Sequence, residues 1–221
     1  AHSTPGILDH LQPLLGRDTA VVTAQNGILW WYFHAFHGPL ENRHLEAADP
    51  GGRIWRSLGP ERAIGCVVYP SCEIVEPGVV RHIEGTRFMV GEPDGSKSAR
   101  VTALGEVLTA AGFKAPVRRN IRDDIWFKLL GNATFNPVSV LTRATLEQMG
   151  RDPDVREVIR RMMTEAVTVA AALGVPTIAI FGSTNPVTTG PVGRCSVVIR
   201  HEVPCSPCLK RDCPTDFRCM E

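Results

Sequence analysis

The chain has no long hydrophobic run, no excess of charge of one sign and no internal repeat. Its apolar stretches all fall short of the roughly 18 to 20 residues that a membrane-spanning helix needs. It carries 24 Lys and Arg residues against 23 Asp and Glu residues, a formal net charge of +1, which offers no attraction for nucleic acid or for an anionic membrane surface. No secretory signal is visible either. These absences argue against a nucleic-acid or membrane partner and predict a cytoplasmic protein.

What the sequence does contain is enough for a folded protein. The 221 residues suffice for one or two ordinary domains, and 43% of them are hydrophobic and 21% charged, a composition typical of chains that bury a core. The sequence begins with Ala1 rather than Met, at residues that read as the start of a helix. We therefore expect that further residues precede this position in the intact protein.

The first half of the chain shows the rhythm of an α/β protein. A short amphipathic helix is predicted over residues 5–16, followed by a strand over residues 20–24 and a turn at Asn26-Gly27. Helix, strand and glycine turn in this order indicate a parallel sheet. Two β-rich segments and a helix are predicted to follow, over residues 63–70, 78–92 and 97–112.

From residue 121 onward the pattern becomes helical. Residues 121–142 read as one unit, which Pro137 should kink or break. A second helix is predicted to begin after Asp152 as its N-cap, with Pro153 at its first position, and to end before Gly174. A buried strand and a segment rich in Pro, Cys and Arg come next. The predicted fold is α/β, with a partial Rossmann-like parallel sheet, then an all-helical segment, then an irregular Cys-rich tail.

One of these helices carries a line of polar side chains. In the segment RDDIWFKLLGNATFNP, the residues Asp124, Lys128, Asn132 and Asn136 follow at intervals of four, and each such step turns a helical side chain by only about 40°. Burial of a bare ammonium is costly, so the line indicates either a solvated helix face or a polar cleft. In a cleft, the ammonium can polarise a carbonyl oxygen and supply a proton, while the amides hold hydroxyl or carboxylate groups.

The same segment is one of several motifs that carry a family resemblance. VTAQNGI, PGVVRHIEG, RFMVGEPDG and IRDDIWFKLLGNATFNPVSVLT are similar to segments of ketopantoate reductases (2-dehydropantoate 2-reductases), and the resemblance covers residues 1–175. It implies that residues 1–119 are the C-terminal portion of a Rossmann-like NADP-binding domain and that residues 120–175 begin a helical C-terminal domain. It also implies NADPH-dependent reduction of a 2-keto acid, ketopantoate, to pantoate in pantothenate and coenzyme A biosynthesis.

The resemblance also implies roles for individual residues. Lys128 matches the family's catalytic lysine, which polarises the carbonyl and donates the proton, and Asn132 and Asn136 match its substrate-holding asparagines. Asn26 matches an asparagine near the nicotinamide end of the cofactor, as expected for a turn at the carboxyl end of a sheet strand. Glu84 matches a position near the cofactor pocket, although by itself it also reads as a plain turn residue.

Two features of the family are not found in this sequence. There is no Gly-x-Gly-x-x-Gly turn of the kind that holds dinucleotide phosphates on a helix N-terminus. The helices that supply a substrate-binding serine and a catalytic glutamate in the family do not follow residue 175. We therefore expect an incomplete reductase that is weakly active or inactive. If the chain forms a homodimer, the helix over residues 152–174 is the expected contact.

The last part of the chain resembles a different family. Residues 176–221, which include FGST and CSPCLKRDCPTDFRCM, are similar to the C-terminal part of lipopolysaccharide heptosyltransferases, GT-B enzymes that use an ADP-sugar. There FGST is a phosphate-side turn, which implies this role for Gly182, Ser183 and Thr184. Both families can read AALGVP at residues 171–176. A chimera joined near this string is therefore predicted, and a heptosyltransferase fragment is the alternative function.

The seven cysteines are unevenly placed along the sequence. Cys66 and Cys72 lie in the body, whereas five fall within the last 27 residues, unlike the spread of a secreted disulfide domain. Four thiols close together could hold a tetrahedral zinc ion and make a metal-binding module a third prediction: Cys205, Cys208, Cys213 and Cys219. Reduced structural cysteines or a disulfide pair fit the same spacing.

Overall fold

The computed structural model of the protein describes residues 4–181, 185, 187, 190, 195–200, 203–205 and 208. The chain forms two compact units, Ala1–Leu129 and Leu130–Glu221. The tail residues Gly182, Ser183 and Thr184 lie outside the described residues, as do Cys213 and Cys219. No helix within the described ranges combines the length and hydrophobicity that crossing a bilayer requires.

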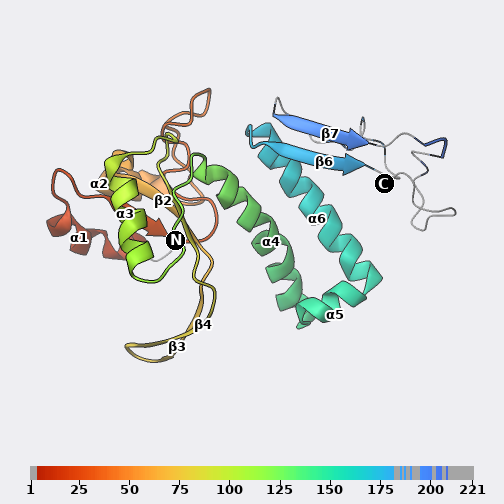
Figure 1. Ribbon diagram of the computed structural model, residues 1–221, viewed down its shortest axis with the longest axis horizontal. Coiled ribbons are helices and arrows are strands. Elements are labelled where there is room, and N and C mark those ends of the chain that lie inside the picture. Colours follow the sequence, from red (N-terminus) through yellow and green to blue (C-terminus); the bar gives the residue numbers. More distant parts are fainter. Residues whose placement is uncertain are drawn as a thin grey trace. The chain divides into compact units, whose positions relative to one another are not determined.

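A three-stranded sheet forms the centre of the first unit (Figure 1). Its order is β1 (Val21–Ala24), β2 (Ala63–Val68) and β5 (Phe88–Gly91), with β1 and β2 parallel and β2 and β5 antiparallel. β2, with the sequence AIGCVV, is buried over its first five residues, as expected for a strand that is covered on both faces. The prediction of an α/β fold with a partial parallel sheet is therefore confirmed. The antiparallel pairing of β5 with β2 was not predicted.

The N-terminal segment differs from the single helix predicted over residues 5–16. It forms 3-10 turns at Thr4–Ile7 and Gln12–Leu14 on either side of the one-turn helix α1 (Leu8–Leu11). Pro13 explains the interruption, because proline has no amide donor to continue the helical hydrogen bonds. The helix over residues 5–16 was predicted from its amphipathic spacing, which does not reflect this effect of proline.

Helices α2 (Arg53–Leu58) and α3 (Ala99–Ala110) complete the first unit before α4 begins. The carboxylate of the fully buried Asp49 accepts hydrogen bonds from the amides of Ile54 and Trp55, at 2.8 and 2.9 Å. It thereby satisfies donors that the first turn of α2 would otherwise leave unpaired. At α3 the N-cap is Ser98, whose hydroxyl accepts from the Val101 amide at 3.2 Å.

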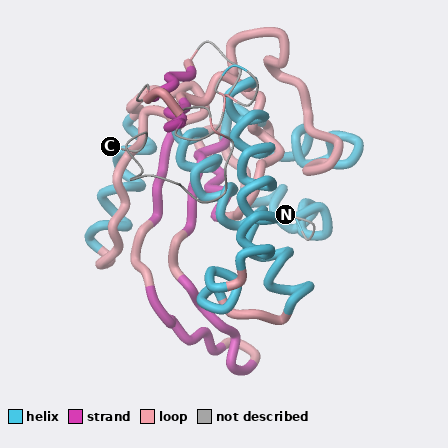
Figure 2. The backbone as a smooth tube through the Cα atoms, turned by 90° about the vertical axis from the view of Figure 1, so that its right-hand side faces the viewer, coloured by secondary structure: helices cyan, strands magenta, loops and turns pink. Residues whose placement is uncertain are grey.

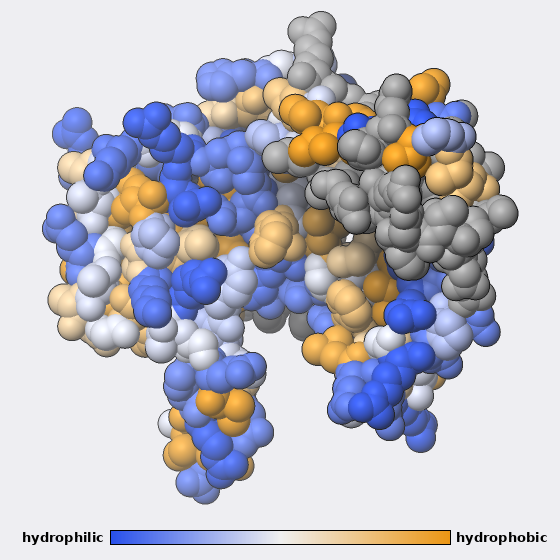
Figure 3. All heavy atoms as spheres, turned by 45° about the vertical axis from the view of Figure 1, so that its right-hand side comes forward, coloured by the Kyte–Doolittle hydropathy of each residue, from blue (hydrophilic) through white to orange (hydrophobic). Residues whose placement is uncertain are grey.

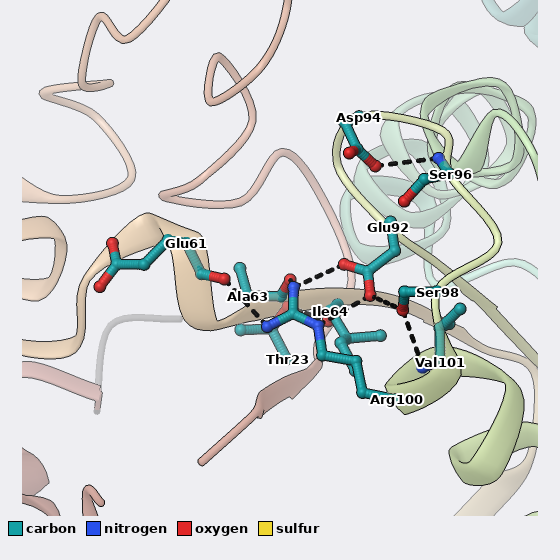
Figure 4. Close-up of polar contacts among 10 residues, drawn as sticks. All are labelled: Thr23, Glu61, Ala63, Ile64, Glu92, Asp94, Ser96, Ser98, Arg100 and Val101. Atoms are coloured by element: carbon teal, nitrogen blue, oxygen red, sulfur yellow. Dashed lines mark hydrogen bonds and ion pairs between the residues drawn. The ribbon is translucent and has the colours of Figure 1, made fainter. Parts of the chain in front are cut away.

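A buried carboxylate ties α3 to the start of β2 (Figure 4). Glu92 is 3% exposed and accepts hydrogen bonds from the Ser98 hydroxyl and from the Arg100 guanidinium, the latter at 2.6 and 2.8 Å. The same guanidinium donates to the carbonyls of Glu61 and Ala63 at 2.9 and 3.2 Å. Because each polar group has a partner, this network fixes α3 without leaving an unpaired charge in the core.

Two glycines on neighbouring strands let helix α4 (Ile121–Thr142) approach the sheet. Gly65 of β2 pairs with Gly91 of β5. A Cβ on Gly65 would lie 2.9 Å from side-chain atoms of both Ile121 and Trp31, and one on Gly91 would lie 2.8 Å from the Arg118 carbonyl oxygen. The first residue of α4 therefore packs directly on backbone, which sets where the rest of its first turns lie.

The main core cluster gathers around this contact. It joins the segment after β1 to α2, β2 and the first turns of α4, and each large aliphatic or aromatic side chain in it contributes about 1.5–3 kcal/mol by burial. Its buried members are Leu8, Leu29, Trp30, Trp31, Ile54, Leu58, Ala63, Val67, Ile121 and Ile125. The aromatic run LWWYFHAF is thus core rather than surface.

Strands β3 (Ser71–Glu76) and β4 (Val79–Glu84) form an antiparallel hairpin that extends away from the sheet (Figure 2). Every residue of both strands is exposed. Apolar side chains are among them, with Ile74 78% and Val80 63% exposed, and Figure 3 shows apolar and polar side chains mixed on the projecting hairpin. A lone two-stranded hairpin is marginally stable, so its conformation depends on how its base is anchored.

The second unit contains the later turns of α4, α5 (Leu146–Arg151), α6 (Pro153–Ala172) and the parallel pair of β6 (Thr177–Phe181) and β7 (Ser196–Arg200). The predicted N-cap of α6 is confirmed, because Asp152 accepts from the amides of Asp154 and Val155 at 2.9 and 3.0 Å. Gly174 follows with a left-handed backbone. Strand β7 was not predicted, since the tail sequence shows little periodicity.

Pro137 does not break α4, contrary to one of the two predicted outcomes. The helix runs unbroken from Ile121 to Thr142 with the proline inside it. A proline removes one backbone donor, and the turns around it are held by packing within the second unit. Val138 is buried there with Met149 and Ile159.

Candidate active site

The two parallel strands end side by side, and polar residues follow each of them. Ala24, the last residue of β1, pairs with Cys66 of β2. Asn26 and Gly27 lie two and three residues beyond β1, and Tyr69 follows the end of β2. Ligands of open α/β sheets bind outside the carboxyl ends of the strands. This edge of the sheet is therefore where a site is expected.

The first turns of α4 fix the segment that follows Asn26. The Arg122 guanidinium donates to the carbonyls of Tyr32, His34 and Pro93, at 2.9 Å to Tyr32 and 2.6 Å to His34, and it lies over the Tyr32 ring. One turn later, Trp126 donates its indole N–H to the Tyr32 hydroxyl at 2.8 Å. The helix that carries Lys128 thus also holds the loop leading away from the β1 turn.

Lys128 lies half-buried on the same helix, next to the end of β2. Its Nζ atom sits 4.8 Å from the centre of the Tyr69 ring. No carboxylate lies within ion-pair distance of it among the described residues. Burial lowers the pKa of Lys128, and the smaller Coulombic effect of the nearby Cys66 acts in the opposite direction. The result is an ammonium that is partly desolvated yet not neutralised by an ion pair.

The Cys66 thiol beside this lysine is buried and neutral. Burial raises its pKa to about 11, against the opposing effect of the Lys128 charge. A thiol with so high a pKa is a poor nucleophile at neutral pH. The thiol is therefore part of the apolar surroundings of Lys128. Of the two groups, the lysine is the one that can transfer a proton.

Asp124, one turn before Lys128, has a different partner. Its carboxylate accepts from Arg118 Nε at 2.8 Å and is buried. The predicted polar line at four-residue spacing therefore begins with a structural ion pair. The ammonium at position 128 is left for another contact.

Comparison with known proteins identifies the fold to which this site belongs. Residues 120–188 match the family model of the ketopantoate reductase PanE/ApbA C-terminal domain. The 2-dehydropantoate 2-reductase of Mesorhizobium japonicum is 53% identical over 175 residues, which are 79% of this chain and 54% of that protein. A crystal structure assigned to a ketopantoate reductase of Ralstonia solanacearum is 41% identical at a TM-score of 0.77, and covers 80% of this chain and 55% of that one. About four fifths of the chain is thus similar to ketopantoate reductases.

The family resemblance predicted from the sequence motifs is thereby confirmed. The chain spans just over half the length of the Mesorhizobium and Ralstonia reductases. Within its reductase region, the described structure brings Lys128 and the residues that follow β2 together. Asn26 is exposed two residues beyond β1, and Glu84 is exposed at the end of β4, opposite Ser71.

The two asparagines predicted to hold substrate lie further along helix α4, beyond Lys128. Asn132 is half-buried and Asn136 is exposed, one and two turns beyond Lys128 on α4. They belong to the second compact unit, whereas Lys128 belongs to the first. Their roles in holding substrate stay predictions.

The sequence reasoning missed Tyr69 and Cys66 as neighbours of Lys128. Both stand at the carboxyl end of a strand that was itself predicted. The rule that placed Asn26 at the end of β1 applies equally to the end of β2. Applied to both strands, it would have pointed to Tyr69.

A second family matches the end of the chain. Residues 166–217 match the model of glycosyltransferase family 9 (heptosyltransferase). Lipopolysaccharide heptosyltransferase 1 of Pseudomonas aeruginosa is 54% identical over 44 residues, 20% of this chain and 12% of that protein. The two family models overlap over residues 166–188, a range that includes the predicted join at residues 171–176.

The described part of the tail shows no metal centre. Cys205 is exposed and Cys208 is half-buried. Over the described residues, no three His, Cys, Asp or Glu side chains gather as a metal ion would require. Two of the four predicted zinc ligands lie outside those residues, so the four-cysteine zinc site stays a prediction.

Proposed function

We propose that the chain acts in the NADPH-dependent reduction of 2-dehydropantoate to pantoate, a step of pantothenate biosynthesis. The observation that carries this proposal is the state of Lys128. Its ammonium is half-buried at the carboxyl edge of β1 and β2, beside an aromatic ring and with no carboxylate partner among the described residues. A cation held in this way is suited to a developing oxyanion.

The chemistry assigned to Lys128 is proton donation. Reduction of the keto group adds one hydride to the carbonyl carbon and one proton to its oxygen. NADPH, when bound, supplies the hydride. The Lys128 ammonium hydrogen-bonds the keto oxygen, stabilises the negative charge that forms there and gives up its proton to complete the alcohol. Solvent then returns a proton to the amine.

Asn132 and Asn136 are proposed to hold the substrate, and Asn26 and Glu84 the cofactor. Four-residue spacing on α4 directs the amides of Asn132 and Asn136 to about the same side of the helix as Lys128. The exposed Asn26 amide at the end of β1 has both a donor and an acceptor, which fits the carboxamide of a nicotinamide. Glu84 is the weaker assignment, because its side chain is exposed on the hairpin.

Lys128→Ala tests this function against a matched lysine. Ketopantoate-dependent oxidation of NADPH is measured for the unsubstituted chain, for Lys128→Ala and for Lys97→Ala, since Lys97 is exposed in the loop before α3. Loss of the proton donor should lower kcat by about 10²–10⁴-fold, whereas Lys97→Ala should leave it unchanged. Equal turnover by all three proteins would contradict the proposal.

A second proposal concerns the tail, supported by its 54% identity to a heptosyltransferase segment. We propose that residues 176–221 derive from an ADP-sugar-dependent glycosyltransferase, in which Gly182, Ser183 and Thr184 would face the sugar-nucleotide phosphates. Titration of the unsubstituted protein and of Ser183→Ala with ADP tests this proposal, because the substitution removes a hydroxyl that would contact the ADP phosphates. Zinc analysis after gel filtration tests the alternative of a four-cysteine zinc site, which predicts one bound metal ion per chain.

A further inference from the structure

The Tyr69 ring contacts two cationic side chains. Lys128 Nζ lies 4.8 Å from the ring centre, and the guanidinium carbon of Arg87 lies 5.1 Å from it. Tyr69 itself is half-buried and packs against the main core cluster. Attraction between a cation and the face of an aromatic ring acts within about 6 Å of the centroid, so both groups are in range.

The backbone of Tyr69 is held from the opposite strand. Its amide donates to the Arg87 carbonyl at 3.0 Å. Gly85, with φ +79°, passes so close that an added Cβ would lie 3.0 Å from the Tyr69 carbonyl oxygen. The base of the β3–β4 hairpin is therefore packed against this residue. The ring is thus anchored before any contact with the lysine is counted.

We propose that Tyr69 is a positioning residue whose ring face holds the Lys128 ammonium in place for proton transfer, with Arg87 fixing the ring from the neighbouring strand. The proposal deepens the proposed function and rests on it only for the part played by Lys128 as proton donor. The contact with the ring stands on geometry alone.

For a lysine that must donate its proton, an aromatic ring is a better partner than a carboxylate. A carboxylate would pair with the ammonium, strengthen its hold on the proton and compete with the substrate oxygen. A ring face attracts the cation without accepting its proton. In the part of the chain that the structure describes, the neutral Cys66 thiol of β2 and the Tyr69 ring lie beside the ammonium, and neither takes the proton that the substrate must receive.

The test varies the ring at position 69 while keeping its shape. The three variants are Tyr69→Phe, Tyr69→trifluorophenylalanine and Tyr69→Met. The first keeps the π face, the second weakens it without changing the ring's outline, and the third replaces it with an apolar chain. Competitive acetylation at a series of pH values, read by mass spectrometry, gives the titration midpoint of Lys128. Lys97 and Lys114, both exposed, serve as internal references, and thermal unfolding confirms that each variant folds.

The proposal predicts an ordered fall in the Lys128 midpoint. The Phe variant should match the unsubstituted protein, the fluorinated ring should lower the midpoint, and Met should lower it most, by about half a unit to one unit. At neutral pH this corresponds to about 3- to 10-fold faster acetylation. Equal midpoints in the Phe and fluorinated variants would overturn the proposal, whether or not the Met variant folds. Activity lost in Lys128→Ala but kept in Lys97→Ala separates the proposed function from this inference, because the midpoints are measured without turnover.

Discussion

At the scale of a single residue, the site depends on how an ammonium is kept charged away from bulk water. Burial alone lowers the pKa of Lys128, because the charged form loses its hydration. The nearest acid on its own helix, Asp124, is occupied by Arg118. The lysine therefore keeps its proton weakly enough to donate it. An ion-paired lysine at the same place would be a poorer acid.

This arrangement predicts the pH dependence of turnover. The acid form of Lys128 is the active one, so kcat/KM should be constant at low pH and fall as pH rises through the pKa of Lys128. Because burial lowers that pKa, the fall should begin below the ordinary lysine value of 10.5. In Lys128→Arg the guanidinium stays charged, so the residual activity should lose this limb. An alkaline limb at the same pH in both proteins would assign it to another group.

At the scale of elements, the close contact between the sheet and α4 decides where the lysine stands. Gly65→Ala places a methyl group 2.9 Å from Ile121 and Trp31 and should destabilise the protein by about 1–3 kcal/mol. Gly131→Ala is the matched control, since outside the backbone of α4 no atom of the described residues lies within 4 Å of an added Cβ there. It should stabilise α4 by up to about 1 kcal/mol. Urea unfolding measures both, and effects of the same sign would contradict this packing argument.

The start of α6 offers a second test at this scale. Asp152 accepts from two backbone amides of the first turn, so Asp152→Ala should lower the free energy of unfolding by about 1 kcal/mol. Asp152→Asn keeps an oxygen acceptor and should cost little. Hydrogen exchange of the α6 amides, compared between the two variants, locates the loss. A loss as large in Asn as in Ala would show that the charge, rather than the cap, is what matters.

The sequence predicted those elements whose signals are local. β1, β2, α3 and α6 follow from apolar runs and capping residues, and the lysine helix follows from its spacing. The antiparallel pairing of β5 with β2 and the pairing of β6 with β7 depend on contacts between segments that are separated along the chain. Those contacts leave little trace in periodicity. Lys128 could be singled out from its spacing on one helix, whereas Tyr69, 59 positions earlier, is found only when the strand-end rule is applied to β2 as well as to β1.

At the scale of the whole chain, the two family matches overlap in one segment. The ketopantoate reductase model ends at residue 188, and the glycosyltransferase model begins at residue 166. The predicted join at residues 171–176 falls where α6 ends at Ala172 and β6 begins at Thr177. A join in a connection between elements leaves both elements intact. This is where two unrelated sequences can be linked at the smallest cost in packing.

If the two parts are of separate origin, the reductase sheet should not depend on the tail. A chain ending at residue 175 should therefore keep the hydrogen-exchange protection of β1, β2 and β5, which belong to the first unit, because their partners all lie within that unit. Protection at the end of α6 should fall, since α6 contacts β6. Exchange measured by mass spectrometry on both chains resolves the two regions. Loss of protection in β2 on removal of the tail would mean that the two parts fold as one cooperative structure, and the chimera proposal would then lose its physical basis.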